Sequence, residues 1–105
     1  MRNAELSVPV DFEIVNFKCT VDYDNLELGE KKTLFLYELD MGDNNLQDIF
    51  NILTLEGEEQ PHEIVKKFCN LKVGEETFIL SGCIVDVFFK NRIKLFCDKI
   101  LLNEE

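Results

Sequence analysis

Four cysteines carry the most distinctive chemistry in this chain of 105 residues. They are separated by 50, 14 and 14 residues, so no two form the Cys-x-x-Cys pair that most zinc sites use. Each lies among apolar neighbours at strand or helical spacing, which favours buried free thiols in a reducing compartment over a disulfide or a metal site. The four residues are Cys19, Cys69, Cys83 and Cys97.

Other residue types that support catalysis are sparse. The single histidine, His62, follows Pro61 in an acidic stretch, and we expect it to be solvated rather than to bind a metal or activate a nucleophile. The five glycines are scattered singly, so the sequence has no phosphate-binding loop, and it has no Gly-x-Ser-x-Gly turn. The sequence therefore predicts a protein that is not an enzyme and that uses no cofactor.

Two aspartate-containing stretches invite comparison with calcium-binding loops. An EF-hand loop needs acidic ligands at its first positions and a glutamate at position 12. Loops that start at Asp22 and Asp40 would instead place Thr33 and Asn51 at that position. Neither stretch fits, so we predict no metal site, and we expect Asp43 to cap the start of a helix.

The acidic residues are unevenly distributed along the chain. The formal charge is −10, from 21 acidic and 11 basic side chains, and no lysine or arginine lies between Lys32 and Lys66. One interpretation is a solvated helical surface that keeps the protein soluble. The other is an acidic face that docks a basic protein partner, as an inhibitor or a mimic of nucleic acid does. The acidic residues of this interval are Glu38, Asp40, Asp43, Asp48, Glu56, Glu58, Glu59 and Glu63.

A basic cluster lies near the other end of the chain, in a predicted hairpin tip. Basic residues cluster there with Phe88, Phe89 and Phe96 nearby, and such a combination on strands is typical of platforms for single-stranded nucleic acid on OB-like barrels. The cluster comprises Lys90, Arg92, Lys94 and Phe96. The net charge of −10 makes nucleic acid the less favoured partner, because phosphate backbones require positive surface.

The elements that would position these residues follow from the alternation of apolar residues. Residues 77–89 predict a strand buried on both faces, residues 90–91 a tight turn, and residues 92–98 a half-buried partner strand. We expect the part from Cys83 to Phe89 to be central in a sheet or to form a homodimer interface, because it is almost wholly apolar. Gly82 predicts an interruption of this strand, most simply a bulge.

The first half of the chain predicts two further strands and two helices. Residues 8–23 are apolar on even positions up to Ile14 and on odd positions from Val15, which predicts one long strand with a bulge or sharp bend. A second strand is expected over residues 32–39. Apolar residues at helical spacing predict helices over residues 43–53 and 61–70, the second of which includes Cys69.

Together these features predict a single α+β domain over residues 1–105. Its order is strand, strand, helix, helix, strand, strand, with two helices packed on a curled, mainly antiparallel sheet that closes towards a barrel. No apolar run is long enough to span a membrane and no signal peptide is present, so we expect a cytoplasmic protein. The favoured function is a non-enzymatic acidic interaction module; the alternatives are an OB-like nucleic-acid binder and a small structural subunit of a larger assembly.

Overall fold

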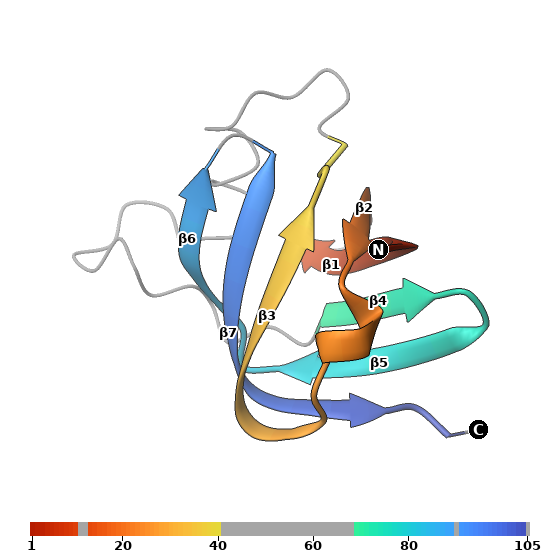
Figure 1. Ribbon diagram of the computed structural model, residues 1–105, viewed down its shortest axis with the longest axis vertical. Helices are drawn as coiled ribbons and strands as arrows, with labels where there is room; N and C mark the ends of the chain where they lie inside the picture. Colours follow the sequence, from red (N-terminus) through yellow and green to blue (C-terminus); the bar gives the residue numbers. More distant parts are fainter. Residues whose placement is uncertain (11–12, 41–68, 90, 105) are drawn as a thin grey trace.

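The computed structural model describes residues 1–10, 13–40, 69–89 and 91–104, and these residues form a closed antiparallel β-barrel of six strands (Figure 1). Three consecutive strands, β1, β2 and β3, make one half of the ring; β4, β5 and β7 make the other. Pairing of β3 with β7 and of β1 with β4 closes the ring, and β6 pairs with β7 beyond the end of β5. The bounds are β1 Arg2–Val10, β2 Glu13–Val21, β3 Gly29–Tyr37, β4 Cys69–Val73, β5 Glu76–Ser81, β6 Ile84–Phe89 and β7 Arg92–Leu102.

The predicted α+β class is wrong, because this part of the chain is almost entirely β-structure. Its only helix is the short 3-10 turn η1, Tyr23–Asn25. The two predicted helices lie largely in residues 41–68, outside the described residues, and Cys69 begins strand β4 instead of ending a helix. The predicted curling of the sheet towards a barrel is confirmed.

The expected long first strand is two strands, β1 and β2, joined as a hairpin. Antiparallel partners face the same side of a sheet, and here Leu6 pairs with Phe17 and Ala4 with Cys19. Even positions of β1 therefore share the barrel interior with odd positions of β2. The change of parity near Ile14 marks a reversal of chain direction, not a bulge, and Ile14 is 68% exposed.

Strand β7 is the longest of the described strands and pairs on both of its edges. Strand β3 runs along one edge, while β5 and β6 lie end to end along the other. The predicted hairpin between β6 and β7 is confirmed, since Phe89 pairs with Arg92. Among the described strands β6 pairs only with β7, so the prediction of a central position for residues 83–89 is wrong; the homodimer alternative stays a prediction.

Gly82 separates β5 from β6 without a bulge. Ser81 pairs with Lys99 before it and Ile84 with Phe96 after it, so the register is unchanged across the interruption. Gly82 has a φ of +58°, a backbone conformation that side chains disfavour, and it lies directly against Asp98. The irregularity in register falls instead between Val85 and Val87.

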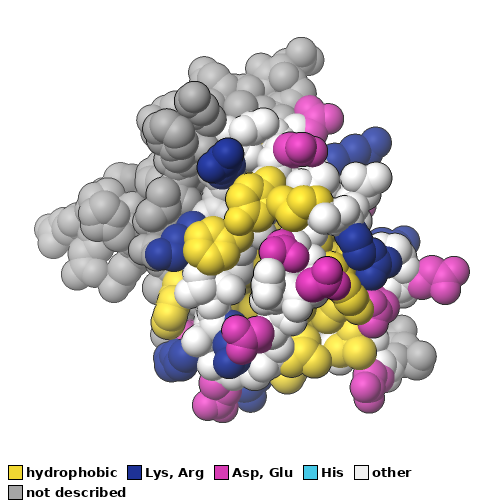
Figure 2. All heavy atoms as spheres, in the orientation of Figure 1, with side chains coloured by type: hydrophobic (Ala, Val, Ile, Leu, Met, Phe, Trp, Pro, Cys, Tyr) yellow, Lys and Arg dark blue, Asp and Glu magenta, His cyan; other side chains and the backbone are white. Residues whose placement is uncertain are grey.

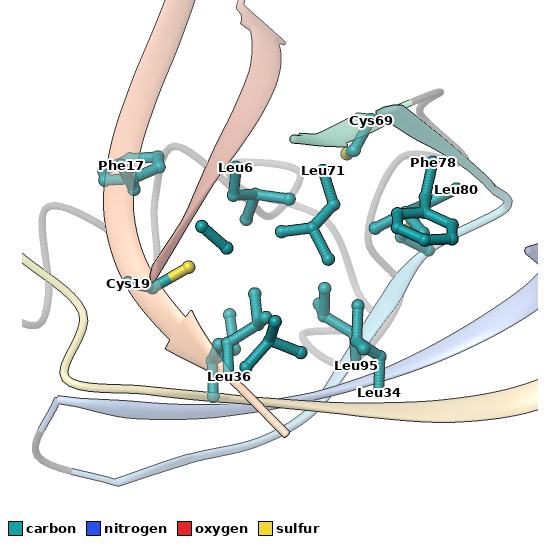
Figure 3. Close-up of a cluster of buried hydrophobic side chains, with 14 of the residues drawn as sticks. Leu6, Phe17, Cys19, Leu34, Leu36, Cys69, Leu71, Phe78, Leu80 and Leu95 are labelled. Carbon is teal, nitrogen blue, oxygen red and sulfur yellow. The ribbon is translucent and has the colours of Figure 1, made fainter. Parts of the chain in front are cut away.

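Leucines from opposite sides of the barrel fill its interior. Figure 3 shows Leu6 and Leu71 pointing across the barrel towards Leu34, Leu36 and Leu95. No buried polar or charged side chain is found among the described residues, so burial of apolar surface dominates the stability of this core. None of the described helices is both long and apolar enough to cross a membrane.

Replacing Gly82 by alanine is expected to lower the free energy of unfolding by about 2 kcal/mol or more. The new Cβ would lie 2.8 Å from Asp98 Cγ and 3.0 Å from Asp98 Cβ. Gly74→Ala is the matched control, because its φ of +62° is similar and its new Cβ would meet only the far end of the Arg2 side chain, at 3.0 Å. Urea unfolding of both variants measures the difference, and equal losses would contradict a close approach at Gly82.

Candidate binding surface on strands β3 and β7

The register of β3 against β7 places a set of aromatic and basic residues on the outside of the barrel. Leu34 pairs with Leu95 and Leu36 with Ile93, and all four are buried. The side chains at the alternate positions of both strands therefore point outwards, since successive side chains of a strand alternate between faces. We call this outward set the β3–β7 face; it comprises Thr33, Phe35, Tyr37, Arg92, Lys94 and Phe96.

Cations and aromatic rings contact one another on the β3–β7 face. The Lys94 Nζ atom lies 5.8 Å from the centre of the Phe35 ring, and the Arg92 Cζ atom lies 5.9 Å from the centre of the Tyr37 ring. Both distances are within the range of cation–π attraction. Phe35 nevertheless remains 47% exposed. Figure 2 shows hydrophobic side chains gathered over β3 and β7, with both basic and acidic side chains at their margin.

A backbone turn bounds the β3–β7 face at one end and an ion pair bounds it at the other. At one end, Glu38 has a φ of +51°, which breaks the alternation of β3 and turns Leu39 into the core. The Leu39 N–H donates a 2.8 Å hydrogen bond to the Asn91 carbonyl and so ties the end of β3 to the start of β7. At the other end, Lys31 Nζ forms a 3.1 Å ion pair with Asp98 Oδ1.

A second surface feature is a shallow, open hollow of about 470 Å³ over β1, β2 and β4. Glu5 lies between Lys18 and Lys72, its partners in the two neighbouring strands. Cys19 lines the hollow but is buried. Burial, and secondarily the Glu5 carboxylate, raise the pKa of Cys19 to about 11. This thiol is therefore protonated near pH 7, which makes it a poor nucleophile.

The residues predicted to form the acidic face fall mostly outside the described residues. Glu38 and Asp40 are both described and exposed, at the end of β3. Asp43, Asp48, Glu56, Glu58, Glu59 and Glu63 all lie within residues 41–68, so the structure does not test whether they form one surface.

The predicted basic cluster is largely brought together. Arg92, Lys94 and Phe96 share the β3–β7 face, whereas Lys90 lies outside the described residues. Phe35 and Tyr37 were predicted to lie in a strand but not in a site. The alternation sets Phe35 and Tyr37 on the face opposite Leu34 and Leu36, but both faces are apolar, so only the structure shows that Leu34 and Leu36 are the buried side.

The predicted burial of the cysteines is confirmed, and all four are free thiols. In the ranges that the structure describes, no group of three or more His, Cys, Asp or Glu residues has the geometry of a metal site. No protein-family model, curated protein or solved structure matches this chain. The arrangement of the site residues is therefore the basis for a functional proposal.

Replacing Phe35 by alanine is expected to change the free energy of unfolding by no more than about 1 kcal/mol, because its ring is half exposed. Leu36→Ala is the matched control on the same strand. Leu36 is fully buried, and its truncation is expected to cost about 2–5 kcal/mol. Urea unfolding compares the two variants. A loss at Phe35 as large as the loss at Leu36 would contradict the outward orientation of the β3–β7 face.

Proposed function

We propose that this protein is a non-enzymatic binding module that holds single-stranded nucleic acid on the β3–β7 face. The observation that carries the proposal is the interleaving of three aromatic residues with two cations on one outward surface. Phe35 and Tyr37 come from β3, and Phe96, Arg92 and Lys94 come from β7. A barrel with such a surface is also compatible with an OB-like binding mode.

The two kinds of residue have complementary roles in this proposal. Exposed aromatic rings stack on bases, and each stacked base contributes about 1–3 kcal/mol to binding. Arg92 and Lys94 attract phosphate groups, and arginine also stacks on bases through its planar guanidinium group. No contact to a base edge is needed, so we expect little sequence preference.

The distribution of charge reduces the objection that the protein is acidic. The stretch 33–65 contains eight acidic residues and no lysine or arginine, and it therefore supplies eight of the ten excess negative charges. The rest of the chain has thirteen acidic and eleven basic residues, a net charge of −2. Two of these eight acids, Glu38 and Asp40, are exposed at the end of β3 beside the β3–β7 face, and the other six lie in residues 41–68. Only two cations lie on the face, so we expect weak affinity.

A second candidate function rests on that same acidic stretch. Its eight carboxylates, with no intervening lysine or arginine, fit an interaction module that binds a basic protein surface. Under this proposal the protein acts as an inhibitor or as a mimic of nucleic acid. A role as a subunit of a larger assembly through residues 83–89 is a third proposal. In each case we place the protein in the cytoplasm, where four free thiols are stable.

Reversing both cations of the β3–β7 face, in Arg92→Glu/Lys94→Glu, is expected to abolish binding to a fluorescently labelled oligothymidine, measured by fluorescence anisotropy. Lys18→Glu/Lys72→Glu is the matched control. It changes the net charge by the same amount at exposed positions on another side of the barrel, and we expect it to weaken binding only slightly. Equal losses in the two double variants would indicate a general charge effect and contradict a specific site.

The salt dependence and the aromatic residues give an independent measurement of the same site. With two phosphate contacts, the logarithm of the binding constant should fall with the logarithm of salt concentration with a slope of about −1.4. Phe35→Ala should weaken binding by about 1–3 kcal/mol without unfolding the protein. Reversing Glu56, Glu58 and Glu59 to lysine should strengthen it. Wild-type affinity in Arg92→Glu/Lys94→Glu would reject the proposal and leave the acidic stretch as the better candidate.

A further inference from the structure

Three of the four buried thiols converge at one place in the barrel wall. Cys69 begins β4, Cys83 lies in the interruption between β5 and β6, and Cys97 lies in β7. Their exposed fractions are 4%, 3% and 0%. The Sγ atoms of Cys83 and Cys97 are 3.8 Å apart, and the Cys83 thiol also hydrogen-bonds with Cys69.

The strand register sets Cys83 directly opposite Cys97. Ser81 pairs with Lys99 and Ile84 pairs with Phe96. In this same register, Cys83 lies opposite Cys97. Opposed residues of antiparallel strands have Cα atoms about 4.5–5.5 Å apart. Disulfides span Cα separations of about 4.4–6.8 Å. Cys69, in contrast, pairs with Leu80 and is not opposite either thiol.

We propose that Cys83 and Cys97 form a cross-strand disulfide when the protein meets a low-molecular-weight disulfide such as oxidised glutathione. The Cys83 thiolate attacks one sulfur of glutathione disulfide, which gives a mixed disulfide and releases one glutathione. The Cys97 thiolate then attacks the Cys83 sulfur, closes the protein disulfide and releases the second glutathione. The two protons lost by the cysteines are carried by the two glutathione thiols, and the protein loses two electrons to the oxidant.

Cys83 is the entry point because it lies where the strand ladder is interrupted. Gly82 and Cys83 fall between the last pair of β5 and the first pair of β6, so opening here breaks few backbone contacts. Hydrogen bonds with Cys69 and Cys97, together with burial, raise the pKa of Cys83. The closed barrel therefore protects the thiols, and the reaction follows local opening instead of occurring at once.

The bond would fasten β6 to β7 next to the β3–β7 face. Cys97 immediately follows Phe96, whose side chain lies on the opposite side of the strand. The proposal does not depend on what the face binds, since it rests only on the thiols and their register.

The test is incubation of the full-length folded protein with excess oxidised glutathione, followed by intact-mass measurement and digestion without reduction. We expect the mass to fall by two hydrogen atoms and the digest to contain one peptide pair linked through Cys83 and Cys97. The thermal midpoint should rise by about 10 °C, because the bond closes a short loop of the unfolded chain. Cys69→Ala is the matched control, and it should still form the bond.

Other outcomes would overturn the proposal. Cys69→Ala/Cys97→Ala is expected to stop at a glutathione adduct on Cys83, because it removes both thiols that contact Cys83. Peptide mapping of the wild type decides the pairing if that variant folds poorly. A link between Cys69 and either other thiol would reject the assigned pair. Stable glutathione adducts without a protein disulfide would show that the two thiols cannot form a bond with each other. An unchanged mass after incubation with oxidised glutathione in urea below the unfolding transition would show the same.

Discussion

Pairing of β3 with β7 is the constraint on which the rest of this structure depends. It runs from Gly29 opposite Ile100 to Leu36 opposite Ile93, and it joins the half made from β1–β3 to the half made from β4, β5 and β7. Without it the sheet would be open, with β3 as an unpaired edge. Closure hides that edge and directs every second side chain of both strands into a common core (Figure 3).

The same pairing creates the candidate binding surface. A register that buries Leu34, Leu36, Ile93 and Leu95 must turn Phe35, Tyr37, Lys94 and Phe96 outwards. Nothing in the packing of the described core requires an aromatic ring at position 35. The Phe35 ring is 47% exposed and lies 5.8 Å from Lys94 Nζ, and we propose that it serves binding rather than stability. Fold and proposed function thus share one cause, which is the alternation of side chains along two paired strands.

Much of the strand content could be predicted from the sequence, because alternation is a local property. The β6–β7 hairpin, the strand that contains Phe35 and the burial of the cysteines follow from it. The parity change near Ile14 has two local explanations, and the residues between Val10 and Glu13 include no glycine or asparagine to favour a turn over a bulge. Cys69–Val73 is too short to identify as a strand alone; its pairing with β1 and β5 defines it. The binding surface needs the β3–β7 register, which joins residues about sixty positions apart and has no local signal.

Amide chemical-shift mapping by NMR is the most direct test of the proposal that the β3–β7 face binds single-stranded nucleic acid. The isotope-labelled protein is titrated with a short oligothymidine, and the perturbed amides are located on the barrel. We expect the amide chemical shifts of β1 and β4 to stay unchanged. The largest changes should fall on the β3–β7 face and its immediate neighbours, at Phe35, Tyr37, Arg92, Lys94 and Phe96. Shifts concentrated on residues 41–68 or around Lys18 and Lys72, or no shifts at a millimolar excess of oligonucleotide, would contradict the proposal.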